Sequence, residues 1–390
     1  MNKKIIPFFA MALTAVTLTA CSGTTGTIKY EAKDPTTTYA WDRNHDGTLG
    51  YLMMIGDKGH NDSLARTEGA EKALIGLGQE LNVTINELAN KEMKNNSGAT
   101  WDATTAGDTM GTWLSQYGDK IDVVVSNNDG MASAAYANSN WPKGLPIFGF
   151  DALPSAAKDI VDGKLAGSIT QNGDAQARAI AQLLRNYAEG VENPLTAGIS
   201  EADSAGNKVE RCTVDYDKAE KKLLVPCGIV TEENADQYLS GSFEKINDNK
   251  GSKTLNVLVT VYNQGDNFLK EVYVPAFKHY GAALGINFTF VEGDGSQEGS
   301  CLDRFTNLDQ YDAYVINMVK TDSGSLYTEK LTGENAKKPV IFYNRQPMVN
   351  GEVDQKTMNF NDKTHYVGVN TEGSGELQGQ MIAQWLKDHK

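Results

Sequence analysis

The stretch Lys120-Ile-Asp-Val-Val-Val-Ser-Asn-Asn-Asp-Gly-Met131 contains the pattern that decides the fold of this chain. Its residues 121–125 form a mostly β-branched run of the kind found in strands that are buried on both faces. Polar residues follow directly, from Ser126 to Asp129. Buried strands of this kind occur in parallel sheets covered by helices, so the stretch predicts an α/β fold.

The same order, strand and then helix, recurs in two sets along the chain. In the first set, the patterns predict strands at 50–55, 83–88, 121–125 and 146–150, and helices at 63–77, 104–116 and 175–187. In the second set, they predict strands at 255–262, 286–291, 313–316, 340–342 and 366–369, and helices at 267–284 and 374–387. We therefore expect two doubly wound parallel-sheet lobes, since 390 residues are too many for one ordinary core.

The N-terminus carries the features of an export signal. Lys3 and Lys4 precede a short apolar stretch, 5–20, which predicts a signal peptide over residues 1–20. The ending Leu18-Thr-Ala-Cys21 resembles a bacterial lipobox, so we expect Cys21 to be lipidated and the protein to be extracytoplasmic and anchored to a membrane by lipid. The alternative is an ordinary signal peptide that happens to end near a cysteine. Residues 21–38 predict a flexible tether.

Charge and cysteine content narrow the function further. The net charge of −14 opposes binding to nucleic acid through a basic surface. Cys212 and Cys227 bracket a hairpin-like segment and predict a disulfide in an exported protein, the alternative being two reduced core cysteines. Cys301 would then be left without a pair. The polar segment around 241–252 predicts a surface linker.

Polar and aromatic side chains gather just beyond the predicted strands, where parallel sheets bind their ligands. They comprise carboxylates, amides, an imidazole, a guanidinium and two aromatic rings: His60, Asp62, Arg66, Trp101, Asn128, Asp151, Asp266, Phe268 and Asn317. This set suits a sugar, because each hydroxyl both donates and accepts hydrogen bonds and the ring has an apolar face that packs on aromatic side chains. Taken singly, an acid or amide after a strand is as readily a helix N-cap, and a tryptophan is more often part of a core.

Several stretches together resemble the family of periplasmic glucose/galactose-binding proteins, which serve ABC sugar import and chemotaxis. They are Trp-Asp-Arg-Asn-His-Asp-Gly (41–47), Gly-His-Asn-Asp-Ser-Leu-Ala-Arg (59–66), the stretch 120–131, Phe-Gly-Phe-Asp-Ala-Leu-Pro (148–154), Gly-Asp-Asn-Phe (265–268), Val-Ile-Asn (315–317), Pro-Val-Ile-Phe-Tyr-Asn (339–344) and Tyr-Val-Gly-Val-Asn (366–370). The blocks after Leu255 resemble the N-terminal part of the family, and those before Val230 resemble its middle and end. The order therefore predicts a circular permutant.

The resemblance implies a two-lobed, hinged periplasmic binding protein fold. One lobe would take residues 39–170, 229–240 and 370–390, and the other 171–228 and 253–369. The resemblance assigns sugar contacts to the nine residues named above, and places Gln171 where the family has Asn. It further implies a monomer that binds D-glucose or D-galactose without chemistry and hands it to an ABC transporter permease and a chemoreceptor.

A second site is indicated at residues 42–50. Asp42, Asn44 and Asp46 place oxygen donors at alternate positions, with Gly at the sixth place and Thr48 at the seventh, as in an EF-hand calcium loop. The resemblance supplies Asp122 as a remote acid ligand for Ca²⁺, although the family has Glu there. Gly50, at the ninth place, has no side chain, so the alternative is an Asx-rich turn that holds no metal.

Functions of other classes make different demands on the sequence. A glycosidase would need two carboxylates flanking one bond, or a hydrolase would use His60 and Asp62, but the acids here are spread around a ring-sized site. A sugar-responsive repressor would need a basic DNA-binding segment where this chain has its signal, and that function is excluded. A sugar receptor without a transport role would show the same site residues as a transport protein.

Overall fold

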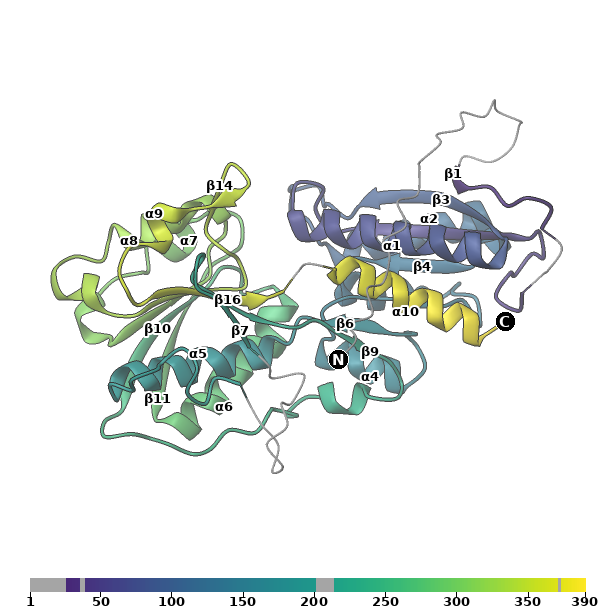
Figure 1. Cartoon of the computed structure of the whole chain (residues 1–390). Helices are drawn as coiled ribbons and strands as arrows, with labels where there is room; N and C mark the ends of the chain where they lie inside the picture. Colours follow the sequence, from purple (N-terminus) through teal and green to yellow (C-terminus); the bar gives the residue numbers. More distant parts are fainter. Residues whose placement is uncertain (1–25, 36–38, 201–213, 371–372) are drawn as a thin grey trace.

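The computed structural model describes residues 26–35, 39–200, 214–370 and 373–390, and these form two α/β lobes that lie side by side (Figure 1). The signal segment, Cys21 and Cys212 lie outside the described residues, so lipidation and the Cys212–Cys227 disulfide remain predictions. Cys227 and Cys301 form no disulfide within the described part of the chain.

The first lobe is built on a five-stranded sheet with the strand order β1-β3-β2-β4-β5. Its strands from β2 to β5 are parallel, as the buried β-branched runs predicted. Helices on this sheet follow the strands along the chain. The elements are β1 (Thr27–Tyr30), β2 (Thr48–Ile55), α1 (Asn61–Leu81), β3 (Thr84–Glu92), α2 (Ala103–Tyr117), β4 (Val123–Ser126), α3 (Asp129–Tyr136), β5 (Ile147–Phe148) and α4 (Pro154–Val161).

Part of the predicted tether is a strand. β1 pairs antiparallel with β3 at the edge of the sheet, with Ile28 opposite Asn86. The prediction of a flexible segment over the whole of 21–38 is therefore wrong for these residues. No local pattern predicts this strand, because four residues at a sheet edge need only backbone pairing, and Ile28 is 58% exposed.

The second lobe is built on a seven-stranded sheet with the order β11-β10-β12-β13-β16-β8-β7. Its five strands from β11 to β16 are parallel, as is the pairing of β16 with β8, while β7 and β8 form an antiparallel hairpin. The elements are α5 (Gly173–Ala188), β7 (Asp215–Asp217), β8 (Lys222–Val225), β10 (Leu255–Val261), η4 (Leu269–Tyr273), α6 (Val274–Leu284), β11 (Ile286–Glu292), α7 (Gly299–Leu302), β12 (Ala313–Ile316), α8 (Gly324–Thr328), β13 (Val340–Tyr343), β14 (Met348–Val349), β15 (Glu352–Val353), α9 (Gln355–Met358) and β16 (Thr364–Val369).

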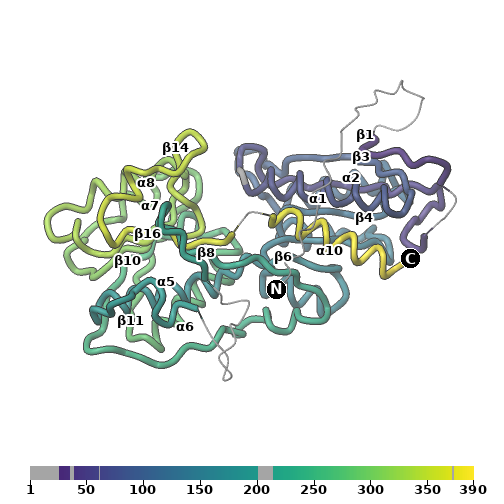
Figure 2. The backbone as a smooth tube through the Cα atoms, in the orientation of Figure 1, coloured from purple at the N-terminus to yellow at the C-terminus, as the bar shows by residue number. Residues whose placement is uncertain are grey.

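The chain passes between the lobes several times (Figure 2). β6 (Ser168–Thr170) and β9 (Gly228–Val230) pair antiparallel in the first lobe, while α5 and β8, which lie between them in sequence, belong to the second. The last helix, α10 (Ser374–Asp388), returns to the first lobe and packs along α1. The close packing needs glycine, because a Cβ on Gly375 would lie 1.9 Å from the Ala65 carbonyl oxygen.

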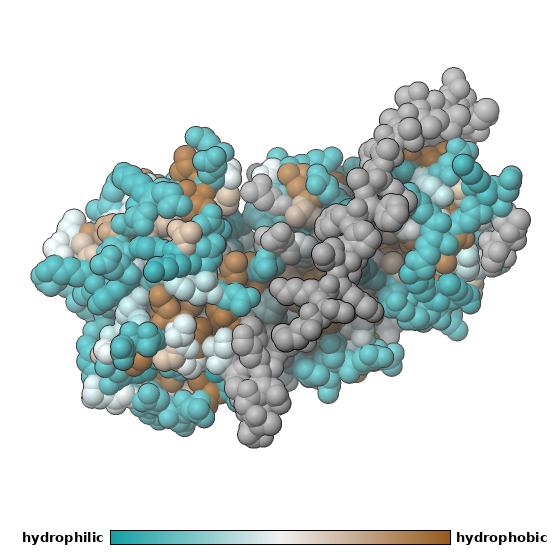
Figure 3. All heavy atoms as spheres, in the orientation of Figure 1, coloured by the Kyte–Doolittle hydropathy of each residue, from teal (hydrophilic) through white to brown (hydrophobic). Residues whose placement is uncertain are grey.

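The surface is mostly polar, and the helices are unlike membrane spans. Figure 3 shows hydrophilic residues over most of the visible face of both lobes, which agrees with the acidic composition. Within the described ranges, every helix is too short or too polar to span a membrane.

Candidate functional site

A cleft between the lobes has a volume of about 370 Å³, within the usual range for small-molecule sites. Both lobes contribute to its lining, mostly through residues just beyond the carboxyl ends of strands, as expected for parallel sheets. The lining includes His60, Asp62, Arg66, Thr100, Trp101, Asn128, Asp151 and Gln171 on the side of the first lobe and the hinge, and Tyr262, Asn263, Asp266, Asn267, Phe268, Asn344 and Arg345 on the second.

Nine of the ten residues predicted to bind sugar line this cleft, and Asn317 does not. Asn317 directly follows β12 and is fully buried in the second lobe, where its backbone exchanges hydrogen bonds with Thr260. Its side-chain oxygen and nitrogen have no partner in the described structure. This placement is at odds with the prediction that Asn317 contacts the ligand.

Asn344, which the prediction did not name as a site residue, lines the cleft near the end of another strand of the second lobe. It follows β13, which ends one residue earlier, and it lines the cleft together with Arg345. The sequence signal was available, since Asn344 comes two residues after the predicted strand 340–342. Sequence alone does not show which of two neighbouring strands is followed by a residue that lies outside the core. Here that strand is β13.

Two of these polar residues, His60 and Asn128, also cap helices, which was the alternative interpretation of their positions after strands. The Nδ1 atom of His60 accepts a hydrogen bond from the Asp62 amide at 3.2 Å, at the start of α1. The Asn128 side chain accepts one from the Met131 amide at 2.9 Å, at the start of α3. Capping and ligand binding are therefore compatible: a cap fixes the side chain and leaves other polar atoms directed at the cleft.

Three of the eleven described non-glycine residues with positive φ line this cleft. Trp101, Asp151 and Asn344 all line it and have positive φ values of 60°, 112° and 60°. Residues other than glycine rarely adopt such values, and the strain concentrates at functional sites in proteins. These strained residues therefore lie at the same cleft as the side chains predicted to bind sugar.

Trp101 rests directly on the main chain of the first lobe. A Cβ on Gly56 would lie 2.1 Å from its ring, so only glycine allows this position. The guanidinium of Arg66 lies 5.6 Å from the centre of the Trp101 ring and 3.7 Å from that of Phe150. The aromatic surface is therefore backed by a buried cation and by glycine, which holds the ring in one orientation.

Arg66 and Asp151 form the charged centre of the site. Arg66 donates to the Asn127 carbonyl oxygen at 2.8 Å, and its nitrogens lie 3.5 Å from Asp151 and 3.9 Å from Asp62. Burial raises the pKa of Asp151 to about 7, although Arg66 and Gln171 act in the opposite direction. The Gln171 side chain donates to Asp151, so this departure from the family's Asn occupies one carboxylate oxygen.

His60 is a neutral donor at neutral pH. Burial lowers its pKa, and the Asp62 carboxylate only partly offsets this. Because Nδ1 accepts the Asp62 amide, the proton of the neutral ring lies on Nε2. The cleft thus offers carboxylate acceptors, amide and imidazole donors and two aromatic rings, which together recognise hydroxyl groups on a ring with an apolar face.

A larger groove lies elsewhere, on the first lobe alone. It has a volume of about 1200 Å³, and its lining includes Trp141, Ile229, Met381 and Trp385. None of the predicted ligand residues lines it. Its polar groups do not include an arrangement like that around Asp151, so we place the ligand site in the smaller cleft.

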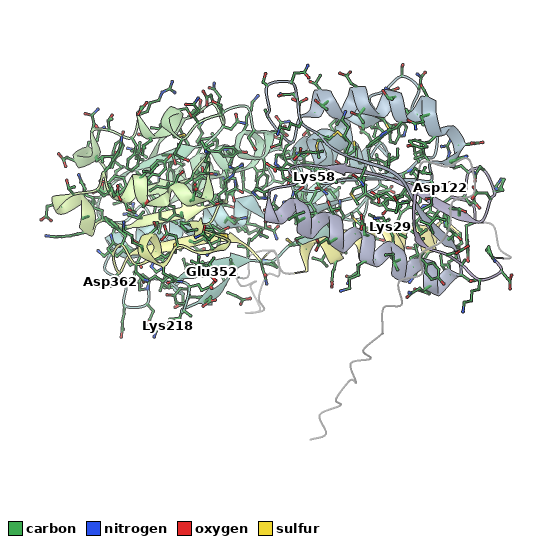
Figure 4. All side chains as sticks on the ribbon, turned by 90° about the horizontal axis from the view of Figure 1, so that it is seen from above. Lys29, Lys58, Asp122, Lys218, Glu352 and Asp362 are labelled. Carbon is green, nitrogen blue, oxygen red and sulfur yellow. The ribbon has the colours of Figure 1, made fainter. Side chains whose placement is uncertain are left out.

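The predicted calcium loop lies in the first lobe, well away from the cleft. Figure 4 shows Asp122 toward the outer end of this lobe, whereas Lys58 lies at the junction of the lobes. Asp42 and Asp122 are almost fully buried. The Asp42 carboxylate accepts hydrogen bonds from the Asp46 and Gly47 amides at 3.2 and 2.9 Å, which folds the loop around it.

The oxygen donors of the loop are of the kind that bind calcium, but the geometry around Asp122 and Gly50 differs from that of a complete calcium loop. Burial raises the pKa of Asp122 to about 8, and the nearby carboxylates of Asp42 and Asp46 add to the effect, so a cation here would relieve repulsion. Both Asp122 oxygens, however, accept backbone amides, from Arg43 and Gly50. Gly50 has no room for a side chain, because a Cβ would lie 2.1 Å from the Lys120 carbonyl oxygen. Among the residues described, no three His, Cys, Asp or Glu side chains are arranged as metal ligands.

The chain is similar to known proteins over both lobes. Two family profiles, each described as a periplasmic binding protein domain, match residues 39–192 and 254–324. The chain is 38% identical over 153 residues to the D-galactose/methyl-galactoside binding periplasmic protein MglB of Haemophilus influenzae, covering 39% of this chain and 43% of that protein. It is 26% identical over 135 residues to a xylitol-binding protein of Mycolicibacterium smegmatis, covering 34% and 36%.

These matches span less than half the length of either curated relative. A solved structure of a carbohydrate transporter solute binding protein from Agrobacterium radiobacter, in complex with D-arabinose, superposes with a TM-score of 0.50 at 13% identity, covering 88% of this chain and 90% of that one. At that identity the superposition shows the fold alone. The fold is that of type I periplasmic binding proteins, with a sheet-based lobe on each side of the cleft.

Proposed function

We propose that this chain, whose two lobes are periplasmic binding protein domains, reversibly captures D-glucose or D-galactose in the cleft between them. The observation that carries the proposal is the composition of this cleft. It places aromatic rings, Trp101 from the first lobe and Phe268 from the second, beside carboxylates and amides from both. The named binding of D-galactose by a relative at 38% identity supports the choice of sugar.

The groups that line the cleft support a mode of binding for such a ligand. Asp151 and Asp266 accept hydrogen bonds from sugar hydroxyls, and Arg66, His60 and the amides donate to them. The rings pack against the apolar faces of the sugar. Since the lining comes from both lobes, a bound sugar favours the closed arrangement, and the proposed activity has no chemical step.

Calorimetric titration of the folded protein with single monosaccharides tests this proposal. We expect glucose or galactose to bind, and sugars that lack the corresponding hydroxyls to bind more weakly. Absence of a response to both sugars in folded protein would refute the proposal. Release of nitrophenol from nitrophenyl glycosides would instead favour a carbohydrate-active hydrolase.

We further propose that the protein is anchored by a lipid on Cys21 and delivers its sugar to an ABC transporter permease. The Leu-Thr-Ala-Cys ending supports the anchor, and the sequence resemblance supports the permease and a chemoreceptor as partners. Mass spectrometry of the mature N-terminus tests the anchor. A transport assay separates an importer from a receptor that binds the same sugar without transporting it.

The circular permutation is also a proposal, and contacts at the chain ends support it. Lys387 near the C-terminus contacts Glu80 at 2.5 Å, and the Tyr39 hydroxyl donates to the Leu81 carbonyl oxygen at 3.2 Å. Residue 39, where the body of the first lobe would begin, and the C-terminal helix therefore both meet the end of α1. A rearranged chain that starts near Leu255 and joins residue 390 to residue 39 should fold and bind the same sugar. Loss of folding in that variant would contradict the permutation.

A further inference from the structure

We propose that Tyr262 and Arg345 are positioning residues, which hold the Asp266 carboxylate in the orientation that a ligand hydroxyl meets. The inference rests on the proposed sugar binding and deepens it. It concerns a stack of three side chains in the second lobe, all of which line the cleft.

The first step is the pair of hydrogen bonds to Asp266. The Tyr262 hydroxyl donates to Oδ2 at 2.6 Å, and the Leu269 amide donates to Oδ1 at 3.0 Å. Each oxygen is thus fixed by one donor and keeps a second acceptor site. A carboxylate held on both oxygens loses little rotamer freedom when a ligand binds, which favours affinity.

The second step is the position of Tyr262 itself. The residue is 8% exposed, and burial raises the pKa of its hydroxyl, with the Asp266 charge adding to the effect. The hydroxyl therefore stays protonated and remains a donor. Its ring lies under the Arg345 guanidinium, whose carbon is 3.8 Å from the ring centre, a cation–π contact.

The third step is the anchoring of Arg345. One of its nitrogens donates to the Val319 carbonyl oxygen, so the side chain spans from the end of β13 to the segment after β12. Arg345 thus contacts both the Tyr262 ring and the Val319 carbonyl oxygen. Arg345 and His60 line the same cleft from opposite lobes, and the Arg345 charge contributes to lowering the pKa of His60.

Because Arg345 contacts Tyr262 and Tyr262 contacts Asp266, we expect substitutions of Arg345 and Tyr262 to have coupled effects on sugar affinity. In Tyr262→Phe the ring and the stack remain, but the hydrogen bond to Asp266 is lost, so we expect sugar affinity to fall by about tenfold. Arg345→Ala should weaken binding by a comparable factor, and Arg345→Lys should restore part of it, since lysine also forms cation–π contacts. The double variant Tyr262→Phe/Arg345→Ala should lose little more than Tyr262→Phe alone.

Calorimetry with the better of the two sugars, on the full chain, provides the measurement. A loss of affinity in the double variant equal to the product of the two single losses would overturn the proposal. It would mean that Arg345 contacts the ligand independently of Tyr262. Unchanged affinity in both single variants would also overturn it, while leaving the sugar-binding function intact. If the unsubstituted protein bound neither sugar, the proposed function would fail instead.

Hydrogen exchange of the Leu269 amide gives a readout that needs no ligand. If Tyr262 fixes Asp266, this amide should exchange faster in both single variants, because its acceptor becomes mobile. Unchanged exchange would contradict the positioning role. Thermal unfolding of each variant distinguishes a local effect from loss of the fold, and Tyr262→Phe is the milder change if Arg345→Ala fails to fold.

Discussion

Asp151 shows how several neighbours adjust one side chain. Its backbone is strained, its carboxylate is buried, and Arg66 and Gln171 both contact its oxygens. Asp129 lies close enough for its own pKa to rise, first through burial and then through the Asp151 charge. Asp129 also accepts the Leu153 amide at 2.8 Å, which fixes the turn that presents Asp151. The turn therefore presents one buried acceptor to the cleft.

The raised pKa of Asp151 predicts that sugar binding depends on pH. With a pKa of about 7 in the free protein, the carboxylate gains its charge as the pH rises through neutrality. An ionised carboxylate is the better acceptor for sugar hydroxyls, so affinity should increase between about pH 6 and pH 8. Calorimetric titration at several pH values measures this. In Asp151→Asn the affinity should be lower and the pH dependence lost; a dependence that persists there would assign it to another group.

The raised pKa of Asp151 also affects stability. Its contribution to the free energy of unfolding falls as the pH rises, whereas the sugar affinity should increase. The folded-state pKa of Asp151 lies above its ordinary value, so the folded protein binds this proton more tightly than the unfolded chain. The contribution is fully present below about pH 4 and is lost as the pH rises through about 7. Asp151→Asn should therefore raise the melting temperature relative to the parent protein more at pH 8 than at pH 5. An equal difference at the two pH values would contradict the raised pKa.

Trp101 gives a test of the aromatic contact. Trp101→Ala removes a large apolar surface from the cleft, so we expect affinity for the sugar to fall at least about tenfold. Trp141→Ala is the matched control, because Trp141 lines the distant groove on the first lobe. That variant should bind sugar as the parent does. Equal losses in both variants would mean that the effect is general destabilisation and not a ligand contact.

At the scale of elements, the sequence predicted the central strands and the five longest helices well, because continuous β-branched runs and amphipathic periods are local signals. The short helices α3, α4, α7, α8 and α9 were not predicted. β12 matches its predicted bounds at Ala313–Ile316, and α10 extends only one residue past its own. β1 was missed, since an edge strand depends on a partner far along the chain. Asn317 and Asn344 show a related limit: each follows a strand, and only the tertiary packing separates the buried Asn317 from the partly buried Asn344, which lines the cleft.

The loop at 42–50 provides an element-level prediction about metal. If it binds Ca²⁺ with micromolar affinity, 1 mM calcium should raise the melting temperature by about 5 °C relative to EDTA. Asp42→Asn should abolish this rise, because it removes the carboxylate around which the loop folds. Asp119→Asn is the matched control, an exposed acid in the same lobe. A melting temperature that does not respond to calcium would favour the turn without metal.

At the scale of the whole molecule, the segment between β9 and β10 adds a connection between the lobes. Its first part, η3 (Ala235–Tyr238), packs against α4 in the first lobe. Its later part lies on the second lobe, where the Phe243 ring stacks on His279 with ring centres 4.5 Å apart and Arg178 donates to the Lys245 carbonyl oxygen at 2.9 Å. The segment between β9 and β10 is thus attached to both lobes, and the predicted linker, 241–252, packs on the second.

This strap, residues 239–242, should limit how far the lobes open. The chain from Tyr238 to Phe243 spans at most about 18 Å when fully extended. The strap also lines a cavity directly behind Asp151 and the crossing at Gly173, so it lies close to the hinge. A sugar acts across the same two lobes, so a shorter reach between the anchors would favour the closed arrangement before any ligand binds.

Lengthening the strap tests this directly. Ten Gly-Ser residues inserted after Ser240 should increase the radius of gyration of the ligand-free protein in small-angle X-ray scattering and leave the sugar-bound value unchanged. Sugar affinity should fall, because the closed arrangement is then a smaller fraction of the free population. The same insertion at Gly351, at the tip of the β14–β15 hairpin, is the control and should not alter affinity. If the strap insertion leaves both the ligand-free dimensions and the affinity unchanged, the three remaining crossings near residues 171, 227 and 370 alone set the range of opening.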